Sequence, residues 1–166
     1  ELAPALQPLS LAFGEQVELV GWAYGGRGPG ATSTVEEARA PEVVVGQSAW
    51  AVLRWRQLAG AKEPLKVSLR LVGEDGHRIG QDDCPLLNDR HLAPPNWDAE
   101  DRPLNVYLIE VEVGPDTLPG SYLWQVVVYE PQTLAPLLWL DADGQLHGEP
   151  ATLGRIRVLG KDDFSS

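Results

Sequence analysis

Residues 65–84, which read LKVSLRLVGEDGHRIGQDDC, decide the fold. Apolar and polar residues alternate in the first half: Leu65, Val67, Leu69 and Leu71 fall on one face, and Lys66, Ser68 and Arg70 on the other. This period of two is typical of a strand with one buried and one exposed face. Asp75-Gly76 then favours a tight turn, because glycine tolerates a positive φ. The stretch therefore predicts a β-hairpin whose return strand spans residues 77–84.

The same alternation recurs along most of the chain. Further strands are predicted at residues 13–24, 48–57, 104–113, 121–129, 137–140 and 151–159. The 17 glycines and 14 prolines favour many turns, and residues 25–41 and 85–103 are predicted to be long loops. Strands with one apolar face must pack as two sheets. We expect an all-β, antiparallel β-sandwich of seven to nine strands, immunoglobulin-, fibronectin- or jelly-roll-like, with a closed barrel as the alternative.

The length of 166 residues fits one domain with its own core. Residues 1–12 show no clear periodicity and are expected to be a linker or lead-in strand, residues 13–160 the sandwich, and residues 161–166 a polar tail. The sequence contains no methionine, not even at position 1, so we expect it to be a piece of a longer protein.

The charge excludes some partners. The chain has 24 acidic and 13 basic residues, a formal net charge of -11. Such a chain repels phosphate backbones and anionic lipid surfaces, so we expect no nucleic-acid partner. The sequence also lacks a run of 18 apolar residues, so this piece is not expected to insert into a membrane directly.

A turn and a strand start near residue 120 resemble a known structural motif. Pro119-Gly120-Ser121-Tyr122 resembles the tyrosine corner of immunoglobulin-like and fibronectin-like domains, which implies a structural role for Tyr122. Trp55 and Trp124 fall on apolar strand faces and are expected to lie in the core.

A wider resemblance runs through about residues 13 to 159. It rests on the order of six pieces: Phe13-Gly14-Glu15-Gln16-Val17, the Trp55 strand, Glu74-Asp75-Gly76, Pro94-x-x-Trp97, Pro119-Gly120-x-Tyr122 and Leu140-Asp141-Ala142-Asp143-Gly144. In this order the chain resembles the C-terminal β-sandwich region of bacterial membrane proteins that are similar to dolichyl-phosphate-mannose-dependent protein mannosyltransferases. The resemblance implies an extracytoplasmic accessory domain without catalytic residues, whose partner is the parent membrane region or another envelope protein.

The residues themselves favour no enzymatic chemistry. No nucleophile motif is present, and Cys84, in an alternating strand, is expected to be a buried structural thiol. The three histidines are too far apart for a zinc site. We expect no bound metal; among metals calcium fits best, with Asp98, Glu100 and Asp101 in the long loop as weak candidate ligands. We expect no cofactor and no catalytic activity.

The six tryptophans are the feature most open to a functional interpretation. Trp97 lies among polar residues that are suited to sugar hydroxyls, namely Asn96, Asp98, Asp101 and Arg102, and Trp50 is the second candidate, on an outer strand face beside Arg54. The alternative is that Trp97 closes an open end of the sandwich and that Trp50 packs under the first long loop. The two functional hypotheses are therefore an accessory interaction domain and a carbohydrate-binding module.

Overall fold

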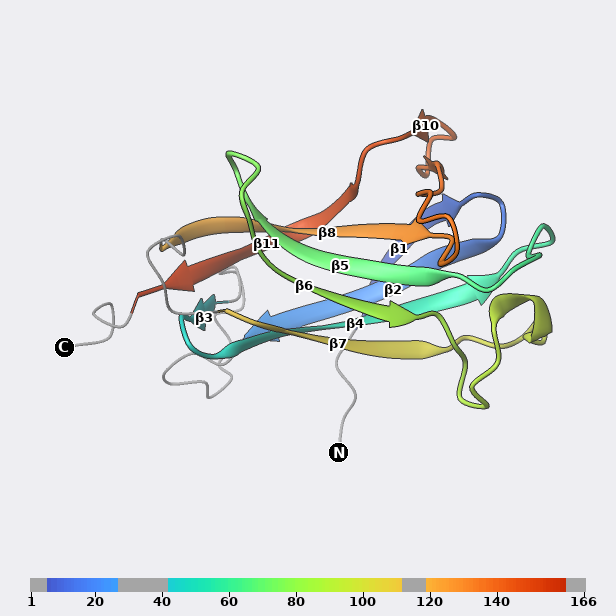
Figure 1. The fold of residues 1–166 in the computed structure, drawn as a ribbon, viewed down its shortest axis with the longest axis horizontal. Coiled ribbons are helices and arrows are strands. Elements are labelled where there is room, and N and C mark those ends of the chain that lie inside the picture. The colour runs from blue at the N-terminus through green and yellow to red at the C-terminus, as the bar shows by residue number, and fades with distance from the viewer. Residues whose placement is uncertain (1–5, 27–41, 112–118, 161–166) are drawn as a thin grey trace.

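The computed structural model describes residues 6–26, 42–111 and 119–160 (Figure 1). Eleven strands and one short 3-10 helix lie within this range. They are β1 (Gln7–Phe13), β2 (Val17–Gly26), β3 (Glu42–Val44), β4 (Ser48–Gln57), β5 (Lys66–Gly73), β6 (Arg78–Pro85), η1 (Pro94–Asn96), β7 (Leu104–Glu110), β8 (Gly120–Tyr129), β9 (Trp139–Leu140), β10 (Leu146–His147) and β11 (Ala151–Leu159).

The strands form two packed sheets. The six-stranded sheet has the order β10-β9-β1-β2-β4-β7, and the five-stranded sheet has the order β3-β11-β8-β5-β6. Neighbouring strands are antiparallel except β3 and β11, which are parallel. The expected all-β sandwich is confirmed, although eleven strands replace the expected seven to nine.

Three further strands explain the difference in number. β1 begins at Gln7 and pairs with both β2 and β9, so residues 7–12 form the lead-in strand that was expected as the alternative to a linker. β3 and β10 are only three and two residues long. Strands this short carry no readable alternation, because their pairing is set by distant parts of the chain.

The core lies between the two sheets and is rich in aromatic rings. Trp22, Trp55, Trp124, Tyr107 and Phe13 are its largest fully buried side chains. The prediction that Trp55 and Trp124 are core residues is confirmed, and Tyr122 is also buried. Full burial of one large apolar side chain contributes roughly 1.5–3 kcal/mol, so this cluster is a major source of stability.

The edge strands β6 and β7, one from each sheet, lie side by side. The Leu108 backbone N–H, on β7, donates to the Asp82 carboxylate, on β6, at 3.0 Å. A Cβ atom at Gly80 would lie 2.4 Å from Ile109 Cγ2, so only glycine permits this approach. The contact occupies a β7 edge group that would otherwise be open to pairing with another chain.

Candidate binding pocket

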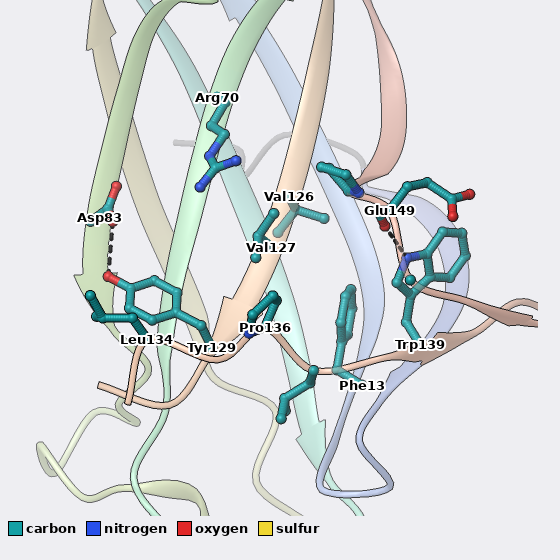
Figure 2. A pocket seen from close by; sticks show the side chains of 13 residues that line it. Phe13, Arg70, Asp83, Val126, Val127, Tyr129, Leu134, Pro136, Trp139 and Glu149 are labelled. Atoms are coloured by element: carbon teal, nitrogen blue, oxygen red, sulfur yellow. Dashed lines mark hydrogen bonds between the residues drawn. The ribbon is translucent and has the colours of Figure 1, made fainter. Parts of the chain in front are cut away.

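A pocket of about 310 Å³ lies where β11 separates from β8 (Figure 2). The pairing of these strands begins at Ala151 and Val126, so the last residues of β8 extend beyond β11. The returning chain bridges Pro136 to Tyr129, and the Leu137 N–H donates to the Val128 carbonyl at 2.8 Å. We call this the β8-end pocket; it is lined by Phe13, Arg70, Asp83, Val126, Val127, Tyr129, Leu134, Pro136, Leu137, Trp139, Gly148, Glu149 and Pro150.

Trp139 forms one wall and is fixed from several sides. It pairs with Phe13 across β9 and β1, and its indole N–H donates to the Glu149 carbonyl at 2.7 Å. Its ring stacks on the His147 imidazole with centroids 4.2 Å apart and an interplanar angle of 19°. A half-buried tryptophan held in this way presents apolar surface at little conformational cost.

The turn behind Trp139 is held by ionisable groups. The Asp141 carboxylate accepts hydrogen bonds from the Asp143 and Gln145 backbone N–H groups, and it lies 2.9 Å from His147 Nε2. The bond to Asp141 raises the pKa of His147 above its ordinary value, and the bond to His147 lowers the pKa of Asp141. Asp143-Gly144 forms a tight turn, with Gly144 at φ 83°.

The opposite wall is polar and is built on the outer face of β5, β6 and β8. Asp83 accepts three hydrogen bonds: from the Tyr129 hydroxyl at 2.9 Å, the Ser68 hydroxyl at 3.0 Å and the Gln81 amide at 2.7 Å. Arg70 Nε donates to the Ser68 hydroxyl oxygen at 3.0 Å. Burial, followed by the bond to Asp83, raises the pKa of Tyr129, so this phenol stays protonated and donating at neutral pH.

Trp97, the leading candidate from the sequence, is not part of this pocket. Its ring is only 4% exposed and belongs to the core. The indole N–H donates to the Leu92 carbonyl at 2.7 Å, and the Gln57 amide donates to the Pro94 and Trp97 carbonyls. The interpretation of Trp97 as an exposed, sugar-stacking ring is therefore wrong, and the alternative is confirmed: this loop folds its tryptophan into the core as a structural residue.

The polar neighbours of Trp97 bond mainly to their own loop. The Asp101 carboxylate accepts hydrogen bonds from the Asp98 backbone N–H, the Asn88 amide and Arg90. The Asp98 bond is the main cause of the lowered pKa of Asp101. Arg102 donates to the Ala99 and Asp101 carbonyls. Asn96 and Glu100 are exposed.

The same contacts bear on the weak calcium candidates. Within residues 6–26, 42–111 and 119–160, no group of three or more His, Cys, Asp or Glu side chains is placed to hold a metal ion. Asp98, Glu100 and Asp101 are therefore not assembled as calcium ligands. Asp101 acts instead as the hydrogen-bond centre of its loop.

Trp50 lies on the outer face of the six-stranded sheet, as predicted, and is half-buried. Its ring covers Gly25, where an added Cβ would lie 2.8 Å from Cζ2. Leu108, its cross-strand partner on β7, is 59% exposed, and Val106 is 61% exposed. The loop under which Trp50 was expected to pack, residues 27–41, lies outside the described residues. Among the described residues, Trp50 thus borders the apolar side chains of Leu108 and Val106.

Cys84 is half-buried, so the expectation of a buried thiol is met only in part. Its thiol donates to the Asp82 carboxylate at 3.5 Å. Burial, reinforced by Asp82, raises the pKa of Cys84 to about 11. Because the thiolate is the nucleophile, this cysteine is a poor one at neutral pH.

The interpretation of the sequence missed Trp139. Its two-residue strand shows no alternation, and its partners Phe13 and Arg70 are far away in the sequence. The available signal was the position of this tryptophan directly before the polar turn at Asp141–Gly144.

No known protein-family model matches this chain, and the curated proteins include no similar sequence. Among the residues described by the structure, no helix has the length and apolar character needed to cross a membrane.

Proposed function

We propose that this chain is a non-catalytic carbohydrate-binding domain that serves as an accessory part of a larger envelope protein. The observation that carries the proposal is the β8-end pocket, which combines the Trp139 and Tyr129 rings with a few fixed polar groups. Concave, mainly apolar sites with a few well-placed polar groups are typical of small-ligand recognition.

The two walls suit the two kinds of surface on a sugar. Trp139, Val127 and Pro136 offer apolar area for the C–H face of a ring. Arg70 and the phenol of Tyr129 lie on the opposite side (Figure 2), where hydroxyl groups need partners. Because the polar wall rests on three paired strands, its groups are positioned before the ligand arrives.

The carboxylates of the pocket favour binding over hydrolysis. Glycoside hydrolysis uses two carboxyl groups, one of which donates a proton. Asp83 already accepts three hydrogen bonds, and the Glu149 carboxylate lies 3.3 Å from His147 Nδ1. Both groups are thus already engaged in holding other side chains in place.

The accessory role and the extracytoplasmic location follow from the resemblance to the C-terminal region of mannosyltransferase-like membrane proteins. The natural partner is then the parent membrane region or another envelope protein. A second candidate function is an interaction domain without a glycan. It is favoured by the exposed apolar side chains of Leu104, Val106 and Leu108, which project from one face of β7.

Calorimetric titration with a broad panel of oligosaccharides tests the proposal. We expect saturable binding of at least one member, lost in Trp139→Ala. Trp50→Phe is the matched control, because it changes a half-buried tryptophan on the outer face of the other sheet. The proposal fails if no member binds, or if Trp139→Ala binds as well as the unchanged protein.

A further inference from the structure

Arg70 differs from the other arginines of the described residues. Arg56, Arg90, Arg155 and Arg157 each contact a carboxylate, at 2.6, 2.8, 2.8 and 3.0 Å. Arg54, Arg78 and Arg102 have no such partner but are exposed to water. Within the part of the chain that the structure describes, Arg70 alone is half-buried and has no carboxylate within 4.0 Å.

The guanidinium of Arg70 is turned into the β8-end pocket. Figure 2 shows it pointing along the strand toward Tyr129 and Val127. Its Nε donates to the Ser68 hydroxyl, which leaves the terminal nitrogens to face the pocket. Burial, followed by the charge of Arg78, lowers the pKa of Arg70. An arginine still remains charged at every physiological pH, so a partly desolvated cation without a direct ion pair among the described residues lines this pocket.

The carboxylates near the pocket form no direct ion pair with Arg70. Asp83 is beyond ion-pair distance from Arg70 and is held by its three donors. The Glu149 carboxylate lies on the far side from Arg70 in Figure 2, where it contacts His147. Asp83 attracts Arg70 from beyond ion-pair distance, but no described carboxylate contacts the guanidinium directly. An anionic group of the ligand would therefore meet a cation that has no direct ion pair, with apolar surface beside it.

We propose that the β8-end pocket selects a carbohydrate that carries a carboxylate, such as a uronic acid residue. This inference rests on the proposed carbohydrate-binding function and names its ligand class. Arg70 binds the carboxylate through its terminal nitrogens, a bidentate pairing for which the planar guanidinium is suited. The ring of the same sugar lies against Val127 and Trp139. Because the whole chain has a net charge of -11, a short ligand with one or two carboxylates is favoured over a long polyanion.

The test uses pairs of probes that differ only in charge. Short oligosaccharides of galacturonate, of mannuronate and of glucuronate are each compared with their carboxyl-reduced, neutral counterparts by calorimetry. For at least one pair we expect the unchanged protein to bind the acidic member about tenfold more tightly or better, as a charge-assisted pair to arginine implies. Arg70→Gln should bind both members of that pair equally weakly, and Arg70→Lys should retain part of the preference.

Arg54→Gln is the matched control, because it removes an exposed arginine from β4 of the other sheet and should leave the preference unchanged. If neutral members bind as tightly as acidic ones to the unchanged protein, the inference is wrong and the carbohydrate-binding function stands. The same holds if Arg70→Gln folds normally and keeps the preference. If no carbohydrate of either kind binds, both proposals fail.

Discussion

Two loop segments of this protein each centre on a tryptophan, and they use it in opposite ways. In residues 86–103, Trp97 is buried in the core, whereas in residues 130–150 Trp139 is half-exposed and lines a pocket. Both indole N–H groups donate to a backbone carbonyl of their own segment, and both distances are 2.7 Å. The indole hydrogen bond is thus the same in both segments. The two tryptophans differ in what the ring contacts, which is the core for Trp97 and the pocket for Trp139.

The connections of the two segments explain this difference. Residues 86–103 join β6 to β7, which lie side by side as edge strands of the two sheets, so the loop closes an open end of the core (Figure 1). Residues 130–150 leave β8, add β9 and β10 to the other sheet, and return to β11 beside β8. Residues 130–150 therefore lie beside the end of β8 and leave the β8-end pocket between themselves and the five-stranded sheet.

The largest expected effect separates the two tryptophans by stability. Trp97→Ala should lower the free energy of unfolding by about 3–5 kcal/mol, because it leaves a cavity in the core. Trp139→Ala should cost only about 1–2 kcal/mol, because its ring is half-exposed. Chemical denaturation of both variants measures the difference, and equal losses would remove the contrast between the segments.

A smaller effect is expected from the side chain that holds the first loop. The Gln57 amide donates to the Pro94 and Trp97 carbonyls at 2.7 and 3.0 Å. Gln57→Ala should lower the free energy of unfolding by about 1–2 kcal/mol, since two part-buried acceptors lose their donor. Ligand affinity at the β8-end pocket should be unchanged, and a loss of affinity in calorimetry would show that the two segments are coupled.

The smallest expected effect is that the stability of the turn at residues 141–147, in the second segment, depends on pH. Because the pKa of His147 is raised in the folded protein, its protonated form stabilises the folded state. This stabilisation is fully present below the unfolded pKa of about 6.5, and it is lost as the pH rises through the folded pKa. The pKa values of Asp141 and Asp101 are lowered in the folded protein, so these carboxylates stabilise it at neutral pH. That stabilisation is lost only as the pH falls below about 3.8. Between pH 6 and 9, we therefore expect only the His147 turn to loosen.

Amide hydrogen exchange measures this loosening, after correction for the intrinsic effect of pH. The Gln145 and Asp143 amides should lose protection on going from pH 6 to 9, and the Leu92 amide, which donates to Asn88 in the first loop, should not. His147→Gln should abolish the change. Equal loss at Leu92 would point to global unfolding and contradict a local role for His147.

The sequence predicted the parts of the fold that depend on local pattern. Alternation placed Leu69 and Trp124 in the core correctly, because a strand that packs on one face repeats every second residue. It missed β3 and β10, which exist only through pairing with distant strands. The pocket was missed for the same physical reason. Its floor, at Val127, and its wall, at Trp139, are brought together by the pairing of β9 with β1.

The division of the β8-end pocket between scaffold and wall has a consequence for protein engineering. The polar side belongs to β5, β6 and β8, whereas the apolar wall opposite comes from the single uninterrupted stretch 134–150, apart from Phe13 beneath it. A single cassette exchange would therefore replace the apolar wall of the pocket while every strand of the five-stranded sheet stays in place. Libraries randomised at exposed Leu134 and Leu138 would diversify this segment without touching the hydrophobic centre of the molecule.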